Sequence, residues 1–160
     1  MTGHIRPIVV CVFRNGNRIL VGDGYDSRKR EAFYRPPGGG IQFGERSEVA
    51  LHREMAEELG VEIERPKLLG VLENLFTFDG EEAHEVVFVY DAQLKDKSLY
   101  EVVSFRGSES DGSSFDARWI EVDSVGPNSP PVYPNGLTEL LKKGQEPGQA
   151  APWTAAGAGD

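Results

Sequence analysis

Three glutamates, Glu54, Glu57 and Glu58, are spaced so that a single helix would carry them on one face. At about 100° per residue, they fall within an arc of about 100°. Carboxylates crowded together in this way repel one another and destabilise a bare helix. A bound cation would remove that repulsion, and clustered carboxylate oxygens suit Mg²⁺ or Mn²⁺ better than zinc. The spacing therefore predicts a site for a hard divalent cation.

The helix that carries these acids is expected to have Ser47 as its N-cap and to end at Gly60. The other side of the helix would pack on a core through five apolar residues: Val49, Leu51, Met55, Ala56 and Leu59. His52 falls on this apolar side, so we interpret it as a packing residue rather than a metal ligand.

Two polar or glycine-rich segments precede this helix. Residues 36–40 read Pro-Pro-Gly-Gly-Gly, and glycine lets a backbone come close to a ligand. Asp23 to Glu31 is polar and predicts an exposed loop, which contains the basic run Arg28-Lys29-Arg30. A solvated surface is the simpler interpretation of this run. Contacts to phosphate groups are the alternative, favoured by its position just before the glycine loop.

The remaining chain reads mostly as strands. Ile8 to Phe13 predicts a buried strand, and a turn at 14–17 leads into a second strand at 18–22. Further strands are expected at 68–78, with a bulge at Glu73-Asn74, and at 85–90 and 117–122. Residues 106–116 are the most loop-like internal stretch, and 136–143 predicts a short amphipathic helix. Because the strong helix lies between strands, we expect a mixed sheet with helices on both faces.

Composition narrows the class of protein. A chain of 160 residues is most simply one domain, which we place at 1–143, with 144–160 as a disordered tail. The net charge of −9 argues against a stable nucleic-acid partner. The single cysteine, Cys11, fits a cytoplasmic protein, and the apolar run at 8–13 is too short to cross a membrane. We expect a monomer or a homodimer.

The spacing of the residues around the three glutamates matches a known pattern. It is Gly39-x5-Glu45-x7-Arg53-Glu54-Met55-x-Glu57-Glu58-x-Gly60-Val61. This stretch resembles the Nudix box at every fixed position. The hairpin before it, the strand led by His84-Glu85-Val86 and the late segment Ala117-Arg-Trp-Ile120 also resemble Nudix domains of the MutT-like type.

The resemblance implies a fold, a reaction and roles for particular residues. The fold would be an α/β/α sandwich (α+β) with a central mixed β-sheet flanked by helices. The reaction would be Mg²⁺-dependent hydrolysis (Mn²⁺ is possible) of the pyrophosphate in a nucleoside diphosphate linked to another moiety. The metal ligands would be Glu54, Glu57 and Glu58, with a backbone carbonyl of Gly38 or Gly39. Arg53 would hold the catalytic carboxylates, and Glu45 would support it.

The general base and the substrate contacts are less constrained. Glu54 is one candidate base, and the late acids Glu109, Asp111 and Asp116 are others; we favour Glu109. Glu85 is either a site acid or a surface residue at the start of a strand. We predict substrate contacts from Arg28, Arg30, Arg35 and Glu85. The aromatic residues Tyr25, Phe33, Tyr34 and Phe76 could stack on a base, although a core position is the favoured interpretation of each one.

Two alternative functions stay open. One is a nucleotide-sensing module that keeps the fold without turnover, although the box acids are all present. The other is isomerase chemistry on an isoprenoid diphosphate, which would need a catalytic cysteine beside the site. Cys11 in an apolar strand is poorly suited to that role. The expected partner is a small-molecule nucleotide, and the sequence does not choose among the possible nucleotides.

Overall fold

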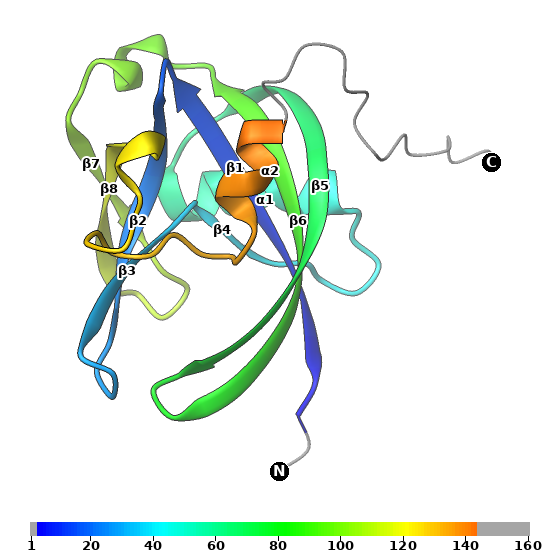
Figure 1. The fold of residues 1–160 in the computed structure, drawn as a ribbon. Coiled ribbons are helices and arrows are strands. Elements are labelled where there is room, and N and C mark those ends of the chain that lie inside the picture. The colour runs from blue at the N-terminus through cyan, green and yellow to red at the C-terminus, as the bar shows by residue number, and fades with distance from the viewer. Residues whose placement is uncertain (1–2, 144–160) are drawn as a thin grey trace.

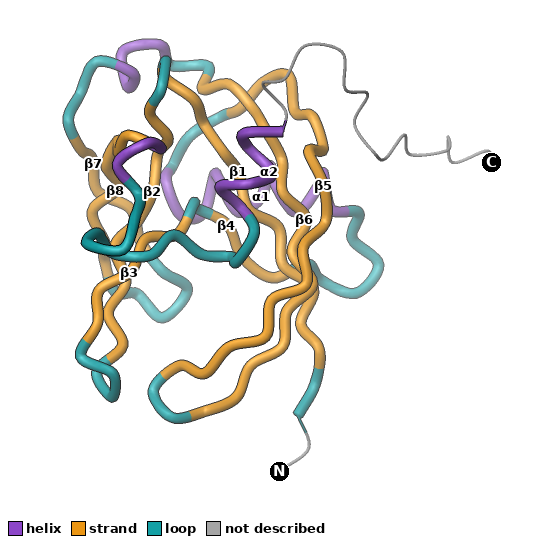
Figure 2. The backbone as a smooth tube through the Cα atoms, viewed as in Figure 1, coloured by secondary structure: helices purple, strands orange, loops and turns teal. Residues whose placement is uncertain are grey.

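The structure of the protein is a computed structural model that describes residues 3–143 (Figure 1, Figure 2). The tail expected at 144–160 lies outside the described residues. Within the described part, no helix is long and apolar enough to cross a membrane. The ten main elements are β1 Ile5–Asn15, β2 Arg18–Asp26, β3 Glu31–Arg35, β4 Gly38–Gly40, α1 Ser47–Leu59, β5 Ile63–Phe78, β6 Glu81–Leu94, β7 Ser104–Ser108, β8 Ser114–Glu121 and α2 Leu137–Lys143. Two short 3₁₀ turns, Lys97–Tyr100 and Val122–Ser124, join them.

The strands form one mixed sheet in the order β5-β6-β1-β2-β8-β7. β1 runs parallel to β6, and the other pairs are antiparallel. β1 and β2 pair only beside their turn, at Arg14 with Ile19 and Asn15 with Arg18. Beyond that point the two strands diverge, so that β4 pairs with β1 while β3 and β8 pair with β2. This divergence opens the sheet next to the glycine strand.

Helices cover both faces of the sheet, which confirms the predicted sandwich (Figure 1). Val9, Cys11 and Phe13 of β1 pack in the cluster that contains Leu51 and Met55 of α1. The alternate β1 residues, including Val10 and Val12, pack in the cluster that contains Leu137 and Leu141 of α2. A strand buried on both faces reads as a continuous apolar run, which is why residues 8–13 carry no polar side chain.

Helix α1 differs from the prediction in three details. It begins at Ser47, but Arg46 is the N-cap and no side chain caps it. The Ser47 hydroxyl instead shares a hydrogen bond of 2.7 Å with the Tyr90 hydroxyl. His52 is exposed, as are Val49 and Ala56, so the packing role predicted for these three is wrong. The buried apolar stripe is narrow because α1 also faces β4 and places Glu54 inward.

Several predicted loops are strands. Asp23–Asp26 extends β2, and only the turn at 27–30 remains of the loop expected at 23–31. Most of 106–116 belongs to the β7–β8 hairpin, with pairs such as Arg106 with Asp116. The bulge expected at Glu73-Asn74 is absent there, because Asn74 pairs regularly with Glu85, and the register shifts lie earlier in β5. Polar composition misled the prediction because neighbouring strands supply the backbone hydrogen bonds.

A matched pair of glycine variants tests the packing of β4. A Cβ at Gly38 would lie 2.0 Å from the backbone oxygen of Val9, whereas at Gly40 the nearest atom is 3.9 Å away. We expect Gly38→Ala to destabilise the protein by about 3 kcal/mol or more, because the backbones must separate. Gly40→Ala should cost less than about 1 kcal/mol. Urea unfolding measures both, and equal losses would contradict this account of the contact.

Candidate functional site

A cavity of ≈ 460 Å³ opens between α1, β4 and the diverging strands. We call it the carboxylate cavity. It collects most of the predicted site residues, which are Arg35, Gly38, Gly39, Glu54, Glu57, Glu58, Glu85 and Glu109. They come from α1, β3, β4, β6 and the turn after β7, so the fold brings together residues that are far apart in the sequence.

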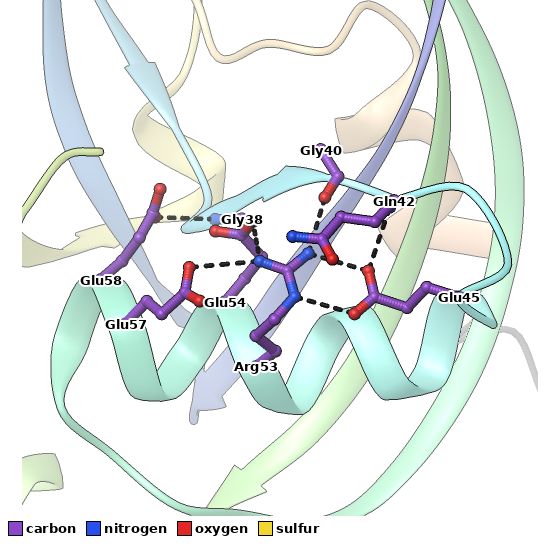
Figure 3. Close-up of polar contacts among 8 residues, drawn as sticks. All are labelled: Gly38, Gly40, Gln42, Glu45, Arg53, Glu54, Glu57 and Glu58. Carbon is purple, nitrogen blue, oxygen red and sulfur yellow. Dashed lines mark hydrogen bonds and ion pairs between the residues drawn. The ribbon is translucent and has the colours of Figure 1, made fainter. Parts of the chain in front are cut away.

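Arg53 joins four separate acceptors through one planar guanidinium (Figure 3). Its Nε and one terminal nitrogen donate to the two carboxylate oxygens of Glu45, each at 2.8 Å. That terminal nitrogen also donates to the Gly40 carbonyl at 2.9 Å. The other donates to Glu54 at 2.8 Å and to Glu57 at 3.2 Å. Charge-assisted, forked contacts of this kind fix geometry well, so Arg53 orients α1 side chains relative to β4.

Two carboxylates of α1 lie directly against the β4 backbone. The Glu54 side chain is so close that a Cβ on Gly39 would lie 2.3 Å from its carboxyl carbon. Glu58 accepts a hydrogen bond of 3.3 Å from the Gly38 N–H. Glycine at position 39 is therefore required by the approach of Glu54.

The donor set fits a hard divalent cation. Glu54, Glu57 and Glu58 offer carboxylate oxygens, and the residues lining the cavity include neither histidine nor cysteine. Within residues 3–143, however, no three acidic, histidine or cysteine side chains are already gathered as a ligand set. Glu57 is bonded to Arg53 with its side chain 59% exposed. Sharing one ion therefore requires the three carboxylates to move closer together, and the exposed side chain of Glu57 is free to do so.

Burial and like charges perturb the acids of this cavity. Burial, reinforced by the charges of Glu109 and Glu54, raises the pKa of Glu58 to about 8. Burial also raises the pKa of Glu109, with the charge of Asp111 adding to the effect. In contrast, the hydrogen bonds from Arg53 lower the pKa of Glu45 to about 2. Glu45 is thus a fixed anion that holds Arg53, whereas burial and neighbouring carboxylates oppose the ionisation of Glu58 and Glu109.

Arg35 and Glu85 form an ion pair at the rim of the cavity, with a nitrogen–oxygen distance of 2.8 Å. Glu85 is only 3% exposed, so the alternative of a surface residue at a strand start is wrong. A buried carboxylate needs such a partner because an unpaired buried charge is costly. The Arg35 side chain, in contrast, stays 33% exposed.

The structure separates two predicted residues from the rest and adds others. Arg28 and Arg30 are absent from the lining of this cavity, and the Arg28 guanidinium lies beside Gly80 at the next hairpin. Arg6, Phe78 and Phe115 line the cavity without having been predicted. These three residues belong to no motif or regular spacing in the sequence that would have marked them as site residues. Phe33, one of the aromatic residues that could stack on a base, also lines the cavity.

Cys11 lies in the core of the sheet with no exposed surface. Burial raises the pKa of its thiol well above the ordinary value. A thiol in this setting is a poor nucleophile, because reactivity requires an accessible thiolate. This observation argues against the isomerase alternative.

Comparisons with known proteins agree with the fold. A model of the NUDIX domain family matches residues 4–156. A MutT NUDIX hydrolase from Burkholderia pseudomallei is similar, with 23% identity and a TM-score of 0.60 over 87% of this chain and 97% of that chain. A NUDIX hydrolase from Nitrosomonas europaea has 21% identity and a TM-score of 0.52, over 75% and 74% of the two chains. A mutator MutT protein from Bacillus halodurans has 17% identity and a TM-score of 0.52, over 86% and 80%. At these identities the solved structures show the shared fold.

We expect Glu58→Gln to stabilise the metal-free protein, and to do so more strongly at high pH. The folded state keeps a proton on Glu58 between its ordinary pKa of 4.5 and about 8, whereas the unfolded state releases it. Stability of the wild type therefore falls as pH rises through this window, and glutamine removes that loss. The measurement is the difference in Tm between variant and wild type at about pH 5 and about pH 8.5, with a chelator present.

Glu48→Gln provides a matched control, because Glu48 is an exposed acid of the same helix outside the cavity. Its effect on Tm should be the same at both pH values. Added Mg²⁺ should raise the Tm of the wild type more than that of Glu58→Gln. A Tm difference for Glu58→Gln that does not change with pH would contradict the account of its charge.

Proposed function

Because the chain belongs to the NUDIX domain family, we propose that it is a hydrolase that uses a divalent cation to cleave the pyrophosphate of a nucleoside diphosphate linked to another moiety. The supporting observation is the carboxylate cavity, where the acids of α1 meet the β4 backbone, Arg35 and Glu109. We propose one domain over 1–143, working on a small-molecule nucleotide in the cytoplasm as a monomer or homodimer.

The cation, Mg²⁺ or Mn²⁺, would be held by Glu54, Glu57 and Glu58 with a carbonyl of Gly38 or Gly39. When bound, such an ion neutralises phosphate charge and lowers the pKa of a water molecule. Arg53 keeps Glu54 in place through a hydrogen bond of 2.8 Å, and Glu45 keeps Arg53 in place through two more. These two residues act by positioning and do not contact the substrate.

Arg35 and Glu109 have direct roles in the proposed reaction. Arg35 and Arg6 are the two cationic side chains in the lining of the cavity, and the planar guanidinium of Arg35 suits a phosphate oxygen. A water oxygen attacks phosphorus, the bond from phosphorus to the bridging oxygen breaks, and a water proton passes to the Glu109 carboxylate. A raised pKa suits Glu109 to this role, because it makes the carboxylate a stronger base.

A hydrolysis assay with Glu57→Gln tests the cation site. With Mg²⁺ present, we expect at least about a ten- to hundred-fold loss of kcat/KM, because a cation ligand is removed. The substrates are an oxidised nucleoside triphosphate, a dinucleoside polyphosphate, a nucleotide sugar and ADP-ribose, with product masses locating the cleaved bond. Chelation should abolish wild-type turnover, and Glu48→Gln should retain it. If Glu57→Gln leaves turnover unchanged, the proposed cation site is wrong. If the wild type binds these nucleotides but hydrolyses none of them, a sensing module is favoured.

The role of Glu109 is tested against its neighbour Asp111. Glu109 lines the cavity, whereas Asp111 does not. The Asp111 carboxylate instead accepts hydrogen bonds from the backbone N–H and the hydroxyl of Ser113. We expect Glu109→Gln to lower kcat by about a hundred-fold or more while leaving the Mg²⁺ dependence of Tm intact, since only the proton acceptor is lost. Asp111→Asn should change kcat less than about three-fold. If both variants turn over like the wild type, Glu109 is not the base.

A further inference from the structure

The sheet is split into two halves beyond the turn that joins β1 and β2. The first half contains β1 with β4, β5 and β6, and the second contains β2 with β3, β7 and β8. Within residues 3–143, two residue pairs beside that turn join the halves as a strand ladder. At the other end, the β2–β3 and β5–β6 hairpins extend in the same direction without pairing as strands (Figure 1, Figure 2). Side-chain contacts between these hairpins therefore fix the spacing of the halves at that end.

Two such contacts lie between the carboxylate cavity and the hairpin tips. Arg35 of β3 pairs with Glu85 of β6 at 2.8 Å. Further along β3, the Phe33 ring meets the Phe78 ring of β5 edge-on, with ring centroids 5.9 Å apart. Because β3 makes both contacts, a shift of the β2–β3 hairpin would disturb both together.

The tips of the two hairpins are joined by reciprocal hydrogen bonds. The backbone N–H and the hydroxyl of Ser27 donate to the same carboxylate oxygen of Asp79, at 2.9 and 2.8 Å. In return, the Asp79 N–H donates to the Asp26 carboxylate at 3.3 Å. The Lys29 ammonium donates to the Thr77 carbonyl at 2.5 Å. We call these five residues the tip clasp.

The tip clasp holds a geometry that the two turns would not adopt freely. Asp26 is only 4% exposed, and one of its carboxylate oxygens accepts the backbone N–H groups of Arg28 and Lys29 at 3.0 Å each. The φ angle is positive at Arg30 (57°) and at Asp79 (49°), one residue in each turn, although neither is glycine. Such a backbone persists only where its surroundings hold it. The contact between the tips is therefore a specific one.

We propose that Asp26 and Asp79 are positioning residues for the reaction. The tip clasp holds β3 against the β5–β6 hairpin, and this keeps Arg35 paired with Glu85 beside the acids of the carboxylate cavity. Neither Asp26 nor Asp79 lines that cavity, so both act through Arg35. This assignment rests on the proposed function, because Arg35 is the side chain proposed to take a phosphate oxygen.

Two variants at position 79 differ in one hydrogen-bond acceptor. Asp79→Gly removes the oxygen that both Ser27 groups use, and glycine adopts a positive φ without strain. Asp79→Asn removes the same charge but keeps one carbonyl oxygen for Ser27, and asparagine tolerates a positive φ. Asp26→Asn acts from the other side. Its one remaining oxygen can hold its own turn, while its NH₂ group faces the Asp79 N–H.

Amide hydrogen exchange measures the tip clasp without any ligand. We expect the Ser27 amide to exchange at least about ten-fold faster in Asp79→Gly than in the wild type, and within about three-fold of the wild type in Asp79→Asn. Asp26→Asn should speed exchange of the Asp79 amide to a similar extent. Equal exchange of the Ser27 amide in Asp79→Gly and Asp79→Asn would contradict the account of the clasp.

Binding of a phosphate probe measures the effect on Arg35. The probe is methylenediphosphonate, a pyrophosphate analogue that is not hydrolysed, with Mg²⁺ present and calorimetry as the measurement. Asp79→Gly should weaken binding by about five-fold or more, whereas Asp79→Asn should stay within about two-fold of the wild type.

A double-mutant cycle separates positioning of Arg35 from general loosening of the protein. The background is Arg35→Gln with Glu85→Gln, because glutamine at both positions leaves no buried charge without a partner. In this background Asp79→Gly should change probe affinity by less than about two-fold, since the residue through which it acts has gone.

Three results would overturn the assignment. They are an Asp79→Gly variant that binds the probe like the wild type, a loss that is equally large in the double-glutamine background, and a wild type that does not bind the probe at millimolar concentration. Because the probe is not cleaved, the outcome is independent of hydrolysis. If probe affinity follows the tip clasp but no nucleotide is hydrolysed, the positioning role stands and the hydrolase proposal fails. If hydrolysis depends on Glu57 and Asp79→Gly changes nothing, the positioning role fails alone.

Discussion

The candidate site depends on one guanidinium. Arg53 sits on α1, yet it binds Glu45 in the preceding loop, the Gly40 carbonyl on β4 and two further acids of its own helix. These contacts join three chain segments whose relative positions decide where the carboxylates point. The planar guanidinium of Arg53 donates hydrogen bonds only in fixed directions. The helix therefore cannot rotate against β4 without breaking several charged hydrogen bonds. The geometry of the acids follows from this restraint.

The second constraint is the close contact between β4 and its neighbours. β1 leaves β2 after two residue pairs, and the glycine strand fills the edge that this divergence exposes. Gly38 lies against the backbone of β1, while Gly39 lies against Glu54. A side chain at either position would separate elements that the Arg53 contacts hold together. Backbone proximity and charge pairing therefore depend on each other.

The metal-free site contains unfavourable charge. Glu58 and Glu109 both have raised pKa values because burial and neighbouring carboxylates oppose their ionisation. This cost falls on the metal-free protein, and a bound cation would relieve it by neutralising the carboxylates.

The sequence alone determined the helix of the box and the identity of its acids, because helical spacing is a local property that three or four residues define. It also predicted the sandwich, the first hairpin and the buried run of β1 correctly. It misread 23–31 and 106–116 as loops, although each contains a hairpin in which residues 23–26 pair with 31–34 and residues 106–108 pair with 114–116. Polar composition hid these strands because backbone groups make the pairing. The same limit applied to Glu85, because its burial and its pairing with Arg35, fifty positions away, are set by tertiary contacts.

Only the tertiary structure decided which residues share a cavity. The basic cluster of Arg28 and Arg30 predicted contacts to the substrate. However, Arg28 lies beside Gly80, and neither residue lines the carboxylate cavity. Phe33, Phe78 and Tyr133 likewise form one group of rings because β3, β5 and the segment at 131–133 converge, and no local spacing encodes that convergence.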